Sequence, residues 1–457
     1  MAEDQTILQD EDELNAARVT AILEAVEASD AVRLAELIEP LHAADVADLL
    51  EQIGSADRRA LLHMWSGEID GDVLSELDES IREEVIESLP REVVAEAMRE
   101  LDTDDVVDIL EDLDAPQQGR ILDALEDADR VAVEQALAYP EDSAGRLMQR
   151  EVVVAPEHWT VGEAIDFLRE SEHLPDQFYH VILIDPRMKP VGYATLGRLL
   201  SSRRNIRLRD ILEDSFRTVT ATEAEADVAY MFNQYHLISC PVVDAGGRLV
   251  GVITIDDAMN VLDEEHEEDM LLLAGVGEES SISDGIYDTV RGRFPWLFVN
   301  LIAANLSALV IGQFSGTISA LVALAALMPI VASMGGNAGT QSLTVAVRAL
   351  ATRDLTSSNA VRVVRREAVV GLINGVAFAA IMALVGWLGY GSPMLGAVLG
   401  AAMIVNQFVA ALAGTLVPLF LERAGFDPAL SSGTFVTTLT DVFGFFVFLG
   451  LASMVLI

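Results

Sequence analysis

The spacing of apolar residues divides this chain into two parts with different patterns. Up to about residue 290, short apolar stretches alternate with charged ones, whereas long apolar runs follow. The five runs cover residues 296–314, 317–334, 368–390, 394–421 and 430–457. A helix needs about 20 apolar residues to cross the hydrocarbon core of a bilayer. We therefore expect residues 294–457 to form an all-α polytopic membrane domain with five transmembrane helices.

Short amphipathic helices are predicted for residues 1–140. Residues 41–51 (LHAADVADLLE) resemble residues 101–111 (LDTDDVVDILE), and a related start lies at residues 89–94. An acidic residue before each apolar stretch is expected to cap the helix. Repeated helix pairs stack into a superhelix, so we predict a superhelical N-domain. The two clear copies leave a plain helical bundle open as the alternative.

Residues 141–262 show alternating strands and helices in two similar halves. Predicted strands lie at residues 152–154, 179–185 and 190–195, and again at 218–220, 239–244 and 249–254. Each half has a helix after its first strand and another after its last. This α/β pattern resembles a tandem pair of CBS domains.

CBS pairs commonly bind adenosine nucleotides through a threonine and an aspartate in their final motif. By this resemblance, Thr254 and Asp257 of the second copy are expected to bind ATP. The first copy has Arg198 where the motif has aspartate, so it is not expected to bind a nucleotide. A purely structural dimerisation module is the alternative.

Charge is distributed as unevenly as hydrophobicity. The chain has 73 acidic and 29 Lys or Arg residues, a net charge of −44, yet residues 291–457 carry a net charge of +3. Nucleic-acid binding is excluded for the acidic part, because phosphates need Lys and Arg. Lys189 is the only lysine, which favours a salt-adapted acidic surface over one that collects divalent cations. Only acids clustered at special positions are therefore candidate metal ligands.

Cysteine content and the first residues bear on the cellular compartment. Cys240 is the only cysteine, so no intrachain disulfide is possible. The polar, acidic first residues do not resemble a secretory signal peptide. We therefore expect the long N-terminal part to remain in the cytosol.

One acidic cluster lies where the soluble part meets a predicted connecting helix at residues 263–293. On a helix, acids four residues apart share a face and repel each other, and a bound divalent cation would reverse that repulsion. A solvated acidic face is the alternative. The candidate ligands are Asp256, Asp257, Asp263, Glu264, Glu267 and Glu268.

Asp441 lies inside the last apolar run, with Thr437 one helical turn before it. A carboxylate at mid-membrane costs about 2.5–3.5 kcal/mol on insertion scales, and such residues usually mark ion or substrate paths. Oxygen ligands of this kind suit Mg²⁺ or Ca²⁺. The alternative is that Asp441 is protonated, or bonded to a neighbouring helix, and only holds the bundle together.

Glycines and amides follow the second apolar run at residues 335–342. We predict irregular backbone here, which membranes tolerate only where it lines a cavity. Its free carbonyls, with Asn337 and Gln341, would offer neutral oxygens to a hydrated cation. A turn that simply ends the helix is the alternative.

Arginines mark alternate connections of the membrane part. They precede the first run and lie between the second and third, and between the fourth and fifth, whereas the other two loops carry no charge. By the positive-inside rule, the N-terminus is expected in the cytosol and the C-terminus outside the cell.

Domain order and two membrane motifs together resemble one family. An acidic helical N-domain, a CBS pair, an acidic connecting helix and five spans occur in that order. Pro329, the stretch at 336–341 and the stretch at 438–445 complete the pattern. Over nearly the whole chain, it is similar to the MgtE magnesium channels and transporters.

The resemblance implies a homodimer in the cell membrane, with a pore between its two membrane domains and no enzymatic activity. Asp441 would hold hydrated Mg²⁺ on the pore axis. Cytosolic Mg²⁺ would bind the acidic contacts and close the connecting "plug" helices over the pore. Mg²⁺ would enter the cytosol down its electrochemical gradient.

Three other functions fit parts of the sequence. A transporter for another divalent cation, such as Co²⁺ or Mn²⁺, is the main alternative, and a CBS nucleotide-regulated membrane sensor is another. An intramembrane metalloprotease would need histidine ligands. All seven histidines precede residue 267, so the sequence argues against that class.

Overall fold

The computed structural model describes residues 14–65, 69–171, 174–175, 177–213, 216–277, 285–430 and 432–457. The chain forms two compact units, Met1–Glu265 and His266–Ile457. Their boundary falls within helix α14 (Ile255–Ala274).

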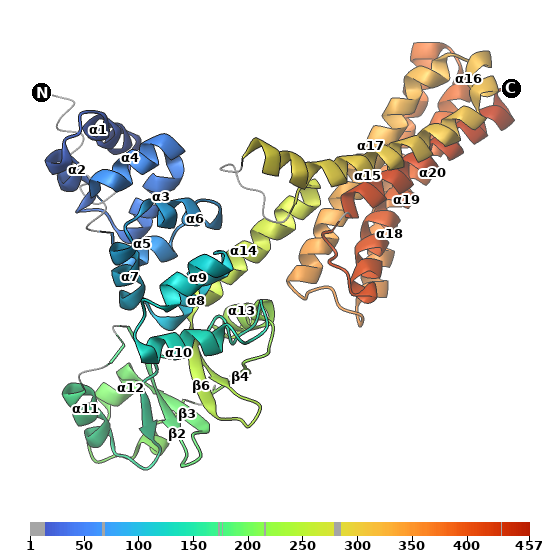
Figure 1. Cartoon of the computed structure of the whole chain (residues 1–457). Coiled ribbons are helices and arrows are strands. Elements are labelled where there is room, and N and C mark those ends of the chain that lie inside the picture. The colour runs from blue at the N-terminus through green and yellow to red at the C-terminus, as the bar shows by residue number, and fades with distance from the viewer. Residues whose placement is uncertain are drawn as a thin grey trace, which may run out of the picture. The chain divides into compact units, whose positions relative to one another are not determined.

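Ten helices form the N-domain in the described part of the first unit. Most pack on the next helix but one: α3 on α5, α4 on α6, α5 on α7, α7 on α9, and α8 on α10. This order is typical of a superhelical stack, and the helical N-domain predicted from sequence is confirmed (Figure 1). The helices are α1 (Ala16–Glu27), α2 (Ala31–Ile38), α3 (Ala43–Gln52), α4 (Ser55–Trp65), α5 (Gly71–Ser75), α6 (Glu79–Ser88), α7 (Arg91–Glu100), α8 (Thr103–Glu111), α9 (Ala115–Leu122) and α10 (Asp127–Ala136).

Two buried arginines join successive layers of this stack in the same way. Arg58 donates to the Leu50 carbonyl at 2.7 Å and pairs with Glu84 at 2.7 Å. Arg82 donates to the Leu77 carbonyl at 2.9 Å and pairs with Asp112 at 2.5 Å. Each guanidinium is thus satisfied by a carbonyl at a preceding helix end and a carboxylate of a later layer, as a buried charge requires.

The predicted acidic caps are wrong for the two similar helices. At α3 the capping residue is His42, whose Nδ1 accepts from the Ala44 amide at 3.3 Å. At α8 the N-cap residue is Asp102, but its side chain makes no capping bond. Its carboxylate instead accepts from Gln149 Nε2 at 3.3 Å. The aspartate is therefore used to join the N-domain to the segment that enters the CBS pair.

Two similar three-stranded sheets form the CBS pair. In the first, β1 (Val154–Pro156) is parallel to β2 (His180–Ile184), and β3 (Pro190–Thr195) is antiparallel to β2. In the second, β4 (Val219–Thr220), β5 (Ser239–Val243) and β6 (Leu249–Thr254) repeat this order. The predicted duplication is confirmed, although β1 lies two residues beyond the predicted strand. Helices α11 (Val161–Glu170), α12 (Leu196–Ser201) and α13 (Glu225–Tyr235), with the short helix η1 (Leu208–Asp210), complete the pair.

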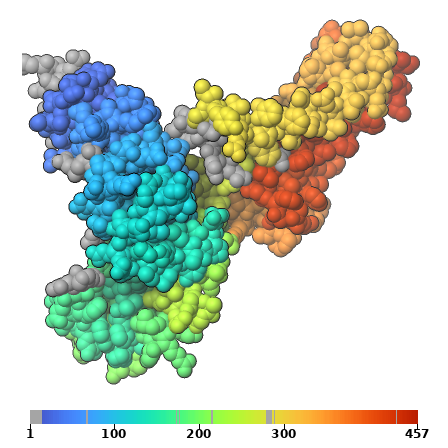
Figure 2. Space-filling model, in the orientation of Figure 1, coloured from blue at the N-terminus to red at the C-terminus, as the bar shows by residue number. Residues whose placement is uncertain are grey.

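The N-domain lies directly against the CBS pair. Thr103 Oγ1 donates to Glu151 Oε1 at 2.7 Å, and Arg146 pairs with Glu111. Figure 2 shows teal residues of the N-domain in contact with green residues of the CBS pair. The start of α8 is therefore held close to the CBS strands.

Long helices make up the second unit. Helix α19 packs against α17, α18 and α20, while α15 packs mainly against α20 (Figure 1). Their bounds are α15 (Ile286–Gln313), α16 (Ser315–Ala320), α17 (Ala323–Ala351), α18 (Ala360–Tyr390), α19 (Pro393–Ala424) and α20 (Ser432–Val455).

Four of these helices, in the part of the chain that the structure describes, are long and apolar enough to span a membrane: α15, α18, α19 and α20. Helix α17 is long enough at 29 residues, but Asn337, Thr340 and Gln341 make its middle polar. Four of the five predicted spans thus qualify by composition. The second predicted span, residues 317–334, is instead divided between α16 and the first half of α17, and α17 continues to Ala351. Residues 263–293, predicted as one connecting helix, hold the end of α14 and the start of α15, and residues 278–284 lie outside the described part.

The prediction of irregular backbone at residues 335–342 is wrong, because α17 runs through this stretch without a break. Its carbonyls therefore remain in the helical hydrogen-bond pattern. The glycines serve close helix contacts instead. A Cβ on Gly335 would lie 2.2 Å from Asn406 Nδ2, and one on Gly339 would lie 2.6 Å from Val436 Cγ1. Small residues commonly occupy such interfaces in membrane bundles.

Candidate functional site

Asp441 lies half-buried on α20, beside a series of threonines. Thr437 Oγ1 donates to the Gly433 carbonyl at 2.9 Å, and Thr440 Oγ1 donates to the Thr437 carbonyl at 2.9 Å. These hydroxyl protons are used inside the helix. Each hydroxyl oxygen keeps lone pairs that can accept hydrogen bonds, for example from the water shell of an ion.

The carboxylate of Asp441 makes no hydrogen bond or ion pair within the described residues. This disfavours the alternative in which Asp441 bonds to a neighbouring helix and only holds the bundle together. Helix α17 lies close by, since a Cβ on Gly336 would be 3.9 Å from Thr437 Cγ2. Asn337 and Gln341 are exposed on α17. The four predicted membrane ligands therefore lie on two adjacent helices.

Glu367 is an acid inside a spanning helix that the sequence analysis missed. It lies in α18 with its side chain 13% exposed, and Ser342 Oγ donates to Glu367 Oε2 at 3.3 Å. The third apolar run begins at residue 368, directly after the arginines, and the sequence pattern therefore places Glu367 in the loop. Asp441 is thus not the only acid within the long helices.

Two adjacent amides of α19 were also missed. Asn406 and Gln407 are 1% and 2% exposed. Asn406 Nδ2 donates to the Val331 carbonyl at 2.7 Å, and Gln407 Nε2 donates to the Met334 carbonyl at 3.5 Å. The side-chain oxygens of both amides lack a hydrogen-bond partner among the described residues. The sequence signal that could have identified them is an adjacent Asn and Gln inside an otherwise apolar run.

In the first unit, acids of α8 approach Asp257 near the start of α14. Burial, followed by the Asp257 charge, raises the pKa of Asp105 to about 7. The same two causes raise the pKa of the buried Asp104 well above its ordinary value. Burial raises the pKa of Asp257 to about 6, and Asp256 adds to that rise. These carboxylates are held at a contact that disfavours their ionised forms.

Other acids of α14 extend along its exposed surface. Asp256, Asp263, Glu264 and Glu267 are exposed, and Glu268 is half-buried. Glu264 contributes to raising the pKa of Glu225, on α13, to about 7, after burial and Asp142. Among the described residues, no three His, Cys, Asp or Glu side chains are grouped so that they can hold a metal ion.

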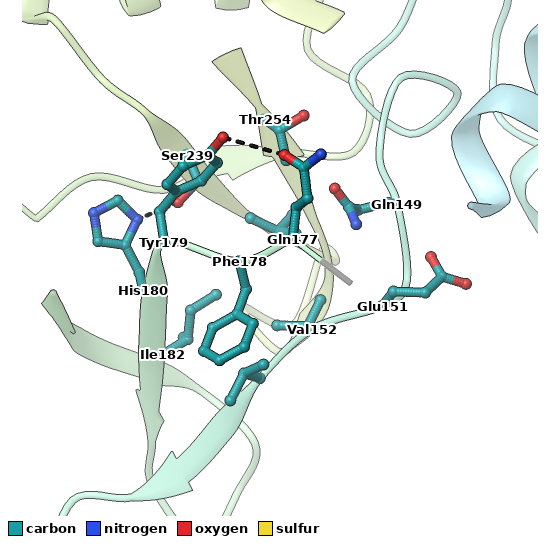
Figure 3. Close-up of a pocket in the computed structure, with 12 residues that line it drawn as sticks. Gln149, Glu151, Val152, Gln177, Phe178, Tyr179, His180, Ile182, Ser239 and Thr254 are labelled. Carbon is teal, nitrogen blue, oxygen red and sulfur yellow. Dashed lines mark hydrogen bonds between the residues drawn. The ribbon is translucent and has the colours of Figure 1, made fainter. Parts of the chain in front are cut away.

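Thr254 lines a cavity of about 30 Å³ between the two CBS sheets (Figure 3). His180 and Ser239, from β2 and β5, form a hydrogen bond beside it, and burial lowers the pKa of His180. Asp257 does not line this cavity, although its Oδ2 accepts from Thr254 Oγ1 at 2.6 Å. Thr254 therefore lies at the cavity itself, and Asp257 is connected to the cavity only through Thr254.

Comparison with known families gives matches along most of the chain. The model for the MgtE intracellular N domain matches residues 41–142. The CBS domain model matches twice, at residues 144–205 and 208–264. The MgtE divalent cation transporter model matches residues 328–451. The chain is 34% identical over 323 residues to the magnesium transporter MgtE of Enterococcus faecalis, covering 70% of this chain and 71% of that protein. The chain belongs to the MgtE family of magnesium transporters. The MgtE of Thermus thermophilus is 33% identical over 363 residues, covering 77% of this chain and 79% of that protein.

A solved structure extends the MgtE relationship to the fold. The cytosolic domain of the Mg²⁺ channel MgtE in complex with ATP matches with a TM-score of 0.50 and 29% identity. The match covers 53% of this chain and 99% of that chain. The family resemblance seen in the sequence is confirmed. This MgtE-family chain is a multi-pass membrane transporter with an intracellular N-domain, not an enzyme.

Proposed function

We propose that this MgtE-family protein is a Mg²⁺-selective channel that admits Mg²⁺ to the cytosol, with Asp441 on the ion path. The observation that carries the proposal is the half-buried carboxylate of Asp441, which has no hydrogen-bond or ion-pair partner among the described residues and lies one helical turn after Thr437. Mg²⁺ dehydrates reluctantly, so acceptors such as Thr437, Asn337 and Gln341 contact its water shell. A negative interior contributes about 2.3 kcal/mol per charge per 100 mV to inward movement.

In this proposal, two copies of the chain in the cell membrane enclose the ion path between their membrane domains. Asn337 and Gln341 are exposed on the bundle of one chain, and Asp441 is only half-buried. A second copy facing these residues encloses them, which supports a homodimer with the path between its membrane domains. Mg²⁺ uptake by vesicles that contain only the purified protein tests this proposal. We expect uptake to increase when the vesicle interior is made electrically negative.

Cytosolic Mg²⁺ closes the proposed channel by binding to the acidic contacts. The raised pKa values of Asp105 and Asp257 support this, because a cation placed between crowded carboxylates replaces repulsion with attraction. An ion that binds the packed state better shifts the population toward it. The proposed regulatory ligands are Asp104, Asp105, Asp256, Asp257, Asp263, Glu264, Glu267 and Glu268.

The end of α14 supplies a link between this regulation and the ion path. Leu272 of α14 is buried together with Leu343 of α17 and Val436 of α20. Val436 is followed in the sequence by Thr437, which is one of the proposed ligands on the ion path. A shift of α14 therefore reaches the helix that carries Asp441.

ATP is proposed as a second cytosolic ligand, at the cavity that Thr254 lines. The ATP complex of the MgtE cytosolic domain supports the ligand class, while the contacts of this chain support Thr254 more than Asp257. The nucleotide is proposed to bind at this cavity, and Asp257 acts through its bond to Thr254.

Topology gives a separate prediction, from the arginine asymmetry. We expect the loop at Ser358 to face the cytosol and the loop at Ser392 and the C-terminus to lie outside the cell. Single substitutions Ser358→Cys and Ser392→Cys, treated with a membrane-impermeant thiol reagent on intact cells, test this. Labelling at 392 alone is the expected result; labelling at 358 alone would refute the arrangement.

A further inference from the structure

Asn406 lies at the junction of three membrane helices. Its side chain belongs to α19 and sits between Gly335 of α17 and Gly444 of α20. A Cβ on Gly335 would lie 2.2 Å from Asn406 Nδ2, and a Cβ on Gly444 would lie 3.0 Å from both Nδ2 and Oδ1. A Cβ on Gly335 would overlap the amide and one on Gly444 would press on it, so both helices pack closely against Asn406.

The hydrogen bonding of Asn406 does not favour burial by itself. Nδ2 donates to the Val331 carbonyl at 2.7 Å, but Oδ1 has no partner among the described residues. Leaving a buried acceptor unsatisfied costs about 1–3 kcal/mol. A leucine, which has the same number of side-chain heavy atoms and no polar group, would avoid this cost. Stability therefore does not explain why an asparagine occupies this position. Its bond to Val331 does explain it, because a buried hydrogen bond specifies a single arrangement of α17 and α19.

The two glycines that touch Asn406 are close in sequence to the proposed ion ligands. Gly444 follows Asp441 by three residues on α20, and residues three apart are neighbours on a helix surface. Gly335 precedes Asn337 by two residues on α17. A rotation or slide of either helix past Asn406 therefore moves a proposed ligand.

We propose that Asn406 is a positioning residue for the cation path, which fixes α17 and α20 against each other so that Asn337 and Asp441 face the same path. This inference rests on the proposed function of Asp441. Asn406 itself is buried and acts through the two helices, by its contacts with Gly335 and Gly444 and its bond to Val331.

Flux measurements in reconstituted vesicles test the positioning role. Asn406→Leu replaces the amide by two bulkier methyl groups and removes the bond to Val331, and Gly444→Ala adds a Cβ that presses on the amide. For both we expect the Mg²⁺ concentration for half-maximal flux to rise several-fold, and discrimination against Co²⁺ to fall. Gly450→Ala, also on α20, is the matched control, because its Cβ would lie 4.0 Å from the nearest atom found, Phe314 Cζ. We expect its flux to match that of the wild type.

A crosslink between α17 and α20 gives a readout that does not depend on flux. A Cβ on Gly336 would lie 3.9 Å from Thr437 Cγ2, so the double substitution Gly336→Cys/Thr437→Cys is placed to form a disulfide. We expect oxidation to join this pair rapidly in the full-length protein, and several-fold more slowly when Asn406→Leu or Gly444→Ala is added. Gly450→Ala leaves the rate unchanged.

The two proposals fail in different ways. An unchanged crosslinking rate in both Asn406→Leu and Gly444→Ala would by itself overturn the role of Asn406. Normal flux in Asp441→Asn would instead overturn the proposed function. Because the crosslink is measured without Mg²⁺ transport, the first failure is recognised whatever the second experiment gives.

Discussion

Asp441→Asn is expected to lose most Mg²⁺ flux while the protein still folds and forms its dimer. The substitution keeps the shape of the side chain and removes the charge that attracts the hydrated ion. Hydrogen bonds to charged groups contribute about 1.5–3 kcal/mol, which corresponds to a fall of roughly ten- to a hundredfold in apparent affinity. The measurement is Mg²⁺ uptake by vesicles that contain equal amounts of folded wild-type and variant protein.

A control separates this effect from a general loss of acidic charge. Glu422 lies near the end of α19 and is exposed, so Glu422→Gln removes a membrane-domain carboxylate without touching the proposed path. We expect it to transport normally. Wild-type flux from a well-folded Asp441→Asn protein would show that Asp441 is not on the path.

Neutralising four acids of α14 is expected to remove most of the Mg²⁺ dependence of the closed state. The variant changes Asp263, Glu264, Glu267 and Glu268 to Asn or Gln. Repulsion between exposed carboxylates is on the order of 1 kcal/mol per close pair in water, and salt screens it. Its loss slightly favours closure without ions. Loss of the ligands has the larger consequence, because closure then no longer responds to Mg²⁺.

Protease protection of the cytosolic part measures this response. Protection should rise with Mg²⁺ in the wild type and rise much less in the neutralised variant. A matched control neutralises four exposed acids of the N-domain: Glu92, Glu96, Glu100 and Asp123. That control should behave as the wild type does. Equal Mg²⁺-dependent protection in all three proteins would identify the α14 acids as a solvated, salt-adapted face.

The pH dependence of protection follows from the acids between α8 and α14. Their pKa values are raised in the folded state, to about 7 for Asp105 and about 6 for Asp257. A raised carboxyl pKa means that the contact is most stable at low pH and loses stability as pH rises through these values. Without Mg²⁺, we therefore expect weaker protection at pH 8 than at pH 5. The protection added by Mg²⁺ should be larger at pH 8, where the ligands are ionised.

Features with a local pattern were predictable from the sequence. The duplicated strands, the amphipathic helices and Asp441 in a long apolar run each follow from spacing over a few residues. The glycines at residues 335–342 were misread, because glycine favours both irregular backbone and close helix packing. The sequence alone does not show that Asn406 lies against Gly335.

Long-range contacts explain what else was missed. Asp104 and Asp105 lie about 150 residues before Asp257, and only the fold of the first unit brings them together. The N-domain acids appeared in the sequence as a solvated face. Glu367 was excluded because the arginines before it suggested a loop, although α18 begins at Ala360. Hydropathy alone places helix ends poorly where arginines extend from the membrane.

Cation flux through the purified wild-type protein, reconstituted in vesicles, tests the central claim most directly. Uptake of Mg²⁺ is measured against uptake of Co²⁺ and Mn²⁺ at equal concentrations, with the vesicle interior negative. We expect Mg²⁺ to enter fastest, without any coupled ion. Faster uptake of Co²⁺ or Mn²⁺ than of Mg²⁺, or no cation flux from folded protein, would contradict a Mg²⁺-selective channel.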